Sequence, residues 1–127
     1  MQRKLLMNSG EKISVEKSYE VRITEEALSD MEKIHCYISE ELHSPGNADR
    51  QYDRIAEQIL SLKNLPKRNR ILDFEPCRRN GMRRLIIDHF SIFYVVRGKT
   101  VIVTDVLYSA SDLSSRLYEK HQKEPEE

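Results

Sequence analysis

The sequence predicts an α+β fold: an N-terminal strand, then an antiparallel helical hairpin packed on one face of a small antiparallel sheet that ends in a three-stranded meander. Two observations predict it. Apolar residues alternate with polar ones near both ends of the chain but recur every three or four positions in between. The links between the late strand-like segments are so short that they require antiparallel hairpins. With 127 residues, the chain has room for one domain.

The first expected elements are a strand and a long helix. Residues 19–23 alternate apolar and polar side chains, as a strand with one buried face does. Thr24 follows as a suitable helix N-cap, with Glu25 and Glu26 in the first turn. We expect the apolar stripe of this helix to consist of Leu28, Met31, Ile34, Ile38 and Leu42.

A turn and a second helix come next. Residues 44–47 read Ser-Pro-Gly-Asn, a composition typical of turns. The helical spacing then resumes and continues to Leu65 and Pro66, which predicts a helical hairpin. Its second apolar stripe is expected to contain Ala48, Tyr52, Ile55, Ala56, Ile59 and Leu60.

The second half of the chain is expected to begin with a charged loop over residues 67–81, anchored by Ile71, Leu72 and Phe74. Three strands then follow each other closely, over residues 82–88, 90–96 and 100–108. One short helix after them would carry Leu113 and Leu117, with Ser111 or Asp112 as its cap.

These elements define a domain over residues 19–118, between a mobile N-terminal tail of residues 1–18 and a charged C-terminal tail of residues 119–127. Both helices are expected to cover the same face of the sheet. The other face would then stay partly open, as a docking surface for a large partner.

The composition favours a folded cytoplasmic protein. Hydrophobic residues make up 39% of the chain and charged residues 33%, and no apolar stretch is long enough for a signal peptide or a membrane span. Cys36 and Cys77 lie far apart and are expected to be reduced thiols. No cysteine and histidine cluster has metal-ligand spacing, so neither a metal nor a cofactor is expected.

Charge is unevenly distributed although the formal net charge is zero. Residues 25–41 are mainly acidic, whereas residues 63–84 hold eight basic side chains against Asp73 and Glu75. Four of the eight form a cluster, which would bind phosphates or carboxylates through planar guanidinium groups: Arg78, Arg79, Arg83 and Arg84. A solvated surface run, or pairing with nearby acids, explains such a cluster equally well.

Strand geometry separates two members of this cluster. Arg83 and Arg84 are adjacent, so on a strand they point to opposite faces. Only one of them would reach the open face, and the other would either snorkel to solvent or find a carboxylate such as Asp88 or Asp105.

No recognised catalytic motif is present: the chain has no Gly-rich phosphate loop, GxSxG elbow or HExxH sequence. His89 at a hairpin tip is a candidate general acid or base, although a histidine in a turn is more often simply exposed. Tyr108 and Asp112 are weaker candidates, because tyrosine is common at strand ends for packing reasons.

The order and spacing of these segments resemble the RelE/ParE superfamily, the toxins of type II toxin–antitoxin modules. Three stretches within about residues 19–117 carry the resemblance. They are the strand of residues 19–23 leading into the helix at Glu25, the turn and second-helix start of residues 44–48 and 52–55, and the meander residues 83–87, 92–94 and 101–107.

The resemblance implies a growth-inhibiting toxin that a cognate antitoxin silences, with any DNA contact made through the antitoxin complex. RelE-like members cleave messenger RNA on the ribosome with basic and tyrosine side chains of the sheet, whereas ParE-like members bind DNA gyrase. In this chain the middle strand reads Phe90-Ser91-Ile92 where the family often has Tyr-Arg-Ile, and the segment after the last strand, residues 108–112, lacks the usual basic groups. Both departures favour a ParE-like, gyrase-binding toxin over an endoribonuclease. A degenerate, non-toxic binding module of the same fold remains a third reading.

The resemblance also implies three sets of site residues. The weak catalytic candidates are Arg83, Arg84, His89 and Tyr108. The expected target-binding residues are Lys67, Arg70, Arg78, Arg79, Arg83 and Arg84. The expected antitoxin-binding residues are Tyr108, Leu113 and Leu117.

Overall fold

A computed structural model describes residues 18–111 and 113–122 of the chain. In chain order the helices and strands are β1 (Glu20–Ile23), α2 (Glu25–Cys36), a π-helical turn (Tyr37–Glu41), α3 (Pro45–Leu60), α4 (Cys77–Asn80), β2 (Arg83–Ile87), β3 (Phe90–Arg97), β4 (Thr100–Tyr108) and α5 (Leu113–Gln122). Short 3₁₀ turns at Ser61–Lys63 and Pro66–Arg68 follow α3. No helix in this described part is long and apolar enough to cross a membrane.

The four strands form one sheet in the order β1-β4-β3-β2. Strands β2, β3 and β4 are joined as consecutive antiparallel hairpins, which confirms the predicted meander. Strand β1 pairs in parallel with β4, so the sheet is mixed, and the prediction of a purely antiparallel sheet was wrong on this point. A parallel pair needs a long connection, and both helices of the hairpin lie between β1 and the meander.

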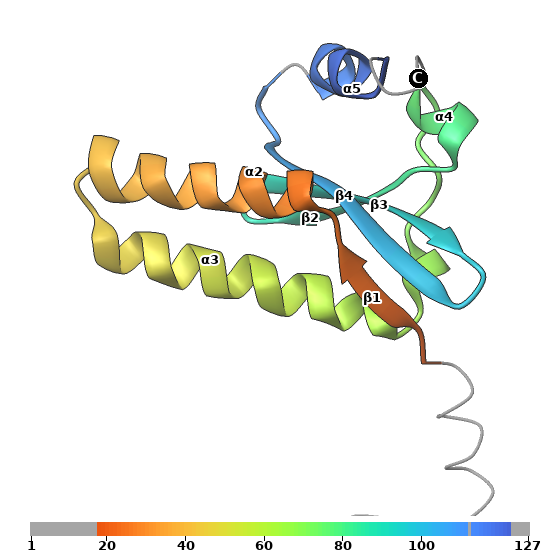
Figure 1. The fold of residues 1–127 in the computed structure, drawn as a ribbon, viewed down its shortest axis with the longest axis horizontal. Helices are drawn as coiled ribbons and strands as arrows, with labels where there is room; N and C mark the ends of the chain where they lie inside the picture. The colour runs from red at the N-terminus through yellow and green to blue at the C-terminus, as the bar shows by residue number, and fades with distance from the viewer. Residues whose placement is uncertain (1–17, 112, 123–127) are drawn as a thin grey trace, which may run out of the picture.

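Helices α2 and α3 lie side by side over one face of the sheet, as predicted (Figure 1). Thr24 caps α2, because its Oγ1 accepts a hydrogen bond of 3.1 Å from the backbone N–H of Ala27. Ala27, Met31, Ile34 and Ile38 are buried against the sheet.

The expected apolar stripes were wrong at three positions. Leu28 is 39% exposed, because the fully buried Ala27 lies at the centre of the stripe and Leu28 is turned away from it. Leu42 is 54% exposed, since the π-helical turn at Tyr37–Glu41 changes the rotation per residue before this position. Leu60 is 60% exposed at the C-terminal end of α3.

Helix α3 starts earlier than expected, inside the predicted turn of residues 44–47. Pro45 occupies the first helical turn, where its missing N–H costs no hydrogen bond. Arg54 then fixes α3 to the β2–β3 hairpin, because its guanidinium binds both carboxylate oxygens of Asp88, at 2.8 and 3.2 Å. These hydrogen bonds from Arg54, and a further one from Gln51, lower the pKa of Asp88.

The second face of the sheet is largely covered, which corrects the prediction that it stays partly open. Helices α4 and α5 lie over this face (Figure 1). They enclose a second core whose buried members are Cys77, Met82, Phe93, Val95 and Leu117. Leu72 and Phe74 pack against it, as the predicted loop anchors, while Ile71 is 45% exposed.

Helix α5 continues to Gln122, so residues 119–122 belong to the fold and not to the C-terminal tail. The other residues assigned to tails, 1–17 and 123–127, lie outside the described residues, as does the candidate cap Asp112. Ser18, the last residue assigned to the N-terminal tail, already pairs with Asn64.

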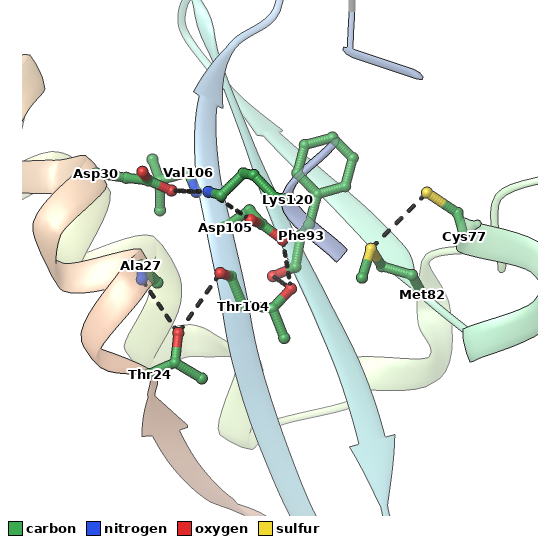
Figure 2. A network of polar contacts seen from close by, with 10 residues as sticks. All are labelled: Thr24, Ala27, Asp30, Cys77, Met82, Phe93, Thr104, Asp105, Val106 and Lys120. Carbon is green, nitrogen blue, oxygen red and sulfur yellow. Dashed lines mark hydrogen bonds and ion pairs between the residues drawn. The ribbon is translucent and has the colours of Figure 1, made fainter. Parts of the chain in front are cut away.

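A partly buried ion cluster fixes α5 to the rest of the molecule (Figure 2). Lys120 Nζ lies 2.6 Å from Asp105 Oδ1 on β4 and 2.9 Å from Asp30 Oδ2 on α2. Asp105 is fully buried, and Asp30 also accepts a hydrogen bond from the backbone N–H of Val106. An irregularity in the β3–β4 pairing makes Thr104 an extra residue, and this turns Asp105 toward α5 instead of toward α2 and α3.

The two thiols should react at very different rates. Cys36 is exposed, whereas Cys77 is buried and burial raises its pKa to about 11. We expect a disulfide reagent at pH 8 to modify one thiol per folded chain and the second only after denaturation. Nearby Glu40 raises the pKa of Cys36, so even this thiol should react more slowly than a free cysteine. A Cys36→Ser variant should show no reaction before unfolding; rapid labelling of that variant would contradict the burial of Cys77.

Candidate functional site

The predicted arginine cluster is divided in the structure, and two of its members are already neutralised. Arg78 lies 3.1 Å from Glu75 and 3.6 Å from Asp73, and Arg79 lies 3.9 Å from Glu75. All three contacts are within or next to the short helix α4. These two guanidinium groups therefore have acidic partners of their own.

Arg83 has a structural role at the start of β2. Its Nη1 donates hydrogen bonds to the backbone carbonyls of Asn69, at 2.6 Å, and Lys67, at 3.2 Å. Tyr94 holds the same loop, since its hydroxyl donates to the carbonyl of Pro66 at 2.6 Å and accepts from Asn69. Arg83 thus fastens a loop to the sheet.

Arg83 and Arg84 point to opposite faces, as predicted, because Arg83 pairs with Tyr94 and Arg84 with Phe93. Of the two alternatives for the second arginine, pairing with Asp88 or Asp105 is not what the structure shows. Asp88 binds Arg54, and Asp105 binds Lys120.

The structure places Arg70 opposite Arg84, an arrangement that the sequence does not reveal. Ile71 and Arg83 make an isolated antiparallel bridge, and the N–H of Leu72 donates to the carbonyl of Met82 at 2.9 Å. In an antiparallel register, Arg70 therefore comes opposite Arg84. Within residues 18–111 and 113–122, neither guanidinium has an ion pair or hydrogen bond with another side chain.

Directly opposite like charges are unfavourable, so this pair is a natural place for an added anion. Lys67 and Arg68 lie exposed on the same loop, and the apolar Ile86 is 55% exposed on β2. β2 is an edge strand, so beyond the Ile71 bridge its outer backbone groups have no neighbouring strand within the part of the chain that the structure describes. We call this the β2-edge surface: Lys67, Arg68, Arg70, Arg84 and Ile86.

The candidate catalytic residues are not brought together. Arg84 lies on the face of the sheet covered by α4 and α5, while Tyr108 lies on the opposite face, with its ring 4.8 Å from that of Phe90. His89 is exposed at the tip of the β2–β3 hairpin. Ser91, which stands where the family often has arginine, is fully buried, with its hydroxyl 2.8 Å from that of Ser109.

The expected antitoxin-binding residues also differ in accessibility. Leu117 is fully buried in the second core and is therefore not accessible to an antitoxin in this conformation. Leu113 is partly buried beside it. Tyr108 is partly exposed and lines a hollow between α2 and the start of α5.

A separate acidic hollow of about 410 Å³ lies between α2 and α3. In it, His35 Nε2 lies 2.8 Å from Asp49 Oδ1, and Glu32 and Asp53 add further acid. Even so, no three His, Cys, Asp or Glu side chains among the described residues are placed to hold a metal ion.

Comparison with known proteins now assigns the family. A family model described as the ParE toxin of the type II toxin–antitoxin system parDE matches residues 21–113, well over half of the chain. The chain belongs to the ParE toxin family. No curated protein matches the sequence. The RelE/ParE resemblance and the α+β fold expected from the sequence are thereby confirmed.

Two solved structures show the same fold. One is described as the chromosomal ParDE toxin–antitoxin system from P. aeruginosa, with a TM-score of 0.62 and 21% identity over 72% of this chain and 97% of that one. The other is the toxin–antitoxin complex RelBE2 from Mycobacterium tuberculosis, with a TM-score of 0.55 and 21% identity over 74% of this chain and 94% of that one.

Proposed function

We propose that this ParE-family toxin inhibits growth by binding DNA gyrase through its β2-edge surface, and that a cognate antitoxin neutralises it. The observation that carries the proposal is the register that places Arg70 opposite Arg84, with neither guanidinium in an ion pair with an acidic side chain of residues 18–111 or 113–122. Family membership supplies the toxin class.

The chemistry of the β2-edge surface suits a macromolecule with acidic groups. Paired guanidinium groups bind carboxylates or phosphates in a fixed geometry. Ile86 adds an exposed apolar side chain beside them, and interfaces commonly combine an apolar centre with a polar rim. A partner seated here would also meet the free edge of β2.

Binding is favoured over messenger-RNA cleavage because the candidate catalytic side chains of the described residues are not brought together. Acid–base chemistry on a phosphate needs its groups within hydrogen-bond reach of one reacting centre. Arg84 and Tyr108 occupy opposite faces of the sheet, and Arg83 is engaged with backbone carbonyls. In the proposed module, the toxin works in the cytoplasm and contacts DNA only through its antitoxin complex.

Gyrase supercoiling measured with purified toxin tests the proposal. We expect wild-type toxin to inhibit the reaction and its induction in cells to stop growth. An Arg70→Gln/Arg84→Gln variant should need at least about tenfold more toxin for half-inhibition, a loss of roughly 1.4 kcal/mol in binding. Its inhibition should also be less sensitive to salt.

The matched control is Arg50→Gln/Lys63→Gln, which removes the same charge from exposed positions away from the β2 edge. It should inhibit like wild type, and both variants should melt near the wild-type temperature. Unimpaired supercoiling together with messenger-RNA cleavage on translating ribosomes would instead establish the RelE-like alternative. Normal growth with folded wild-type protein would indicate a degenerate module.

A further inference from the structure

A second surface, separate from the β2-edge surface, has the features of a socket for one side chain. It is a hollow of about 180 Å³ between α2, the end of β4 and the start of α5. Pockets for small-molecule ligands are usually larger, roughly 300–1,000 Å³. The volume therefore suits a single large side chain. We call it the α2–α5 socket, lined by Asp30, Lys33, Ile34, Tyr37, Val106, Leu107, Tyr108, Ser111 and Arg116.

The walls of the α2–α5 socket are mainly apolar and aromatic. The rings of Tyr37 and Tyr108 meet edge to face with centroids 6.4 Å apart, and Tyr108 in turn packs on Phe90. Tyr37 remains 47% exposed although it is a large aromatic side chain. Such rigid, half-exposed aromatic groups are typical anchors of protein interfaces.

The rim of the socket is positive. Lys33 on α2 and Arg116 on α5 are both exposed, and neither has an ion pair or hydrogen bond with another side chain of residues 18–111 or 113–122. Asp30 is the acid in the lining, and its carboxylate is held by Lys120 and the N–H of Val106. The charge left for a partner is therefore cationic, and the complementary partner is acidic.

We infer that the α2–α5 socket receives one aromatic or branched aliphatic side chain from an acidic segment of the antitoxin. The apolar walls would bury that side chain, and Lys33 and Arg116 would pair with carboxylates beside it. The inference rests on the proposed neutralisation by an antitoxin and adds where and by what chemistry the antitoxin is held.

The test measures binding kinetics between the full-length toxin and the protein encoded by the open reading frame next to the toxin gene. Tyr37→Ala should raise the dissociation rate about tenfold, because it removes the exposed wall of the socket. Lys33→Gln/Arg116→Gln should lower the association rate at least about fivefold and weaken its dependence on salt.

Matched controls separate these effects from general ones. Tyr118→Ala removes a tyrosine of similar exposure, 51%, that does not line the socket, and Arg50→Gln/Lys63→Gln removes two exposed charges elsewhere. Both should bind within about twofold of wild type. A photo-crosslinking amino acid at position 37 should label an antitoxin segment with a large apolar residue next to Asp or Glu.

The outcomes distinguish the two proposals. If wild-type toxin does not bind the neighbouring protein at all, neutralisation itself is contradicted. If wild type binds tightly and the Tyr37 and Lys33/Arg116 variants bind equally well, only the socket inference is overturned. It is also overturned if wild-type toxin alone is a dimer that Tyr37→Ala dissociates, since a second copy of the chain would then fill the socket.

Discussion

Replacing Lys120 by methionine is expected to destabilise the fold by about 3–5 kcal/mol, because it leaves the carboxylate of Asp105 buried without its cation. Methionine retains most of the apolar length of the side chain. The loss of stability therefore measures the contribution of the charge and its hydrogen bonds rather than that of packing. Urea unfolding at pH 7 measures the change. The matched control is Lys63→Met, which removes an exposed lysine that has no ion pair in the described structure. Equal stability of the two variants would contradict the ion cluster.

The same cluster makes the free energy of unfolding depend on pH, and the direction of that dependence follows from the pKa of Lys120. Burial by itself would lower the pKa of this lysine, but hydrogen bonds to Asp105 and Asp30 outweigh it, so the pKa is raised above the ordinary 10.5. A raised pKa contributes stability that is complete below pH 10.5 and is lost as pH rises through the folded-state value. Wild type should therefore lose stability in this alkaline range more steeply than Lys120→Met.

Leu117→Ala is the second substitution with a large expected effect, a loss of about 2–5 kcal/mol. Leu117 is fully buried in the second core, where it packs with Phe93 and Val95, and its truncation leaves a cavity under α5. Thermal and urea unfolding measure the loss. Tyr118→Ala at the next, exposed position should stay within about 0.5 kcal/mol of wild type. Similar small losses for both variants would show that α5 does not pack on the sheet as described.

Local patterns in the sequence predicted much of the fold, because they are set by neighbours along the chain. Three features depend on such local patterns: the Thr24 cap, the helical spacing of Met31 and Ile34, and the tight hairpins of the meander. The predicted apolar stripe of α2 was wrong at Leu28 and Leu42, because a large hydrophobic side chain was expected to be buried. Alanine, and not leucine, permits the close approach of α2 to the sheet at Ala27.

The features that were missed depend on residues distant in the sequence. The second core unites Cys77 and Leu117, and the ion cluster unites Asp30, Asp105 and Lys120, which lie on three separate elements. Lys120 stands in a charged terminal segment, and nothing in its surroundings along the chain marks it as a partner of a buried carboxylate. An acidic residue in a strand is usually assigned to the solvent face, so the burial of Asp105 could not be predicted from the sequence either.

The candidate site was predicted as a run of arginines and is organised differently in space. Sequence proximity grouped Arg78 and Arg79 with Arg83 and Arg84, but ion pairs and carbonyl contacts occupy three of the four. Only the bridge between Ile71 and Arg83 brings Arg70 to Arg84, and such pairing across a loop has no signature in composition.

The parallel contact between β1 and β4 has a consequence for synthesis of the protein on the ribosome. Glu20 is opposite Thr100, so the sheet closes only when nearly the whole chain has emerged from the exit tunnel. Until then the nascent polypeptide has no β4 in the middle of its sheet and no complete scaffold for either proposed binding surface. A message truncated before codon 100 therefore yields a fragment in which β1 has no β4 to pair with, and the sheet is completed only late in translation.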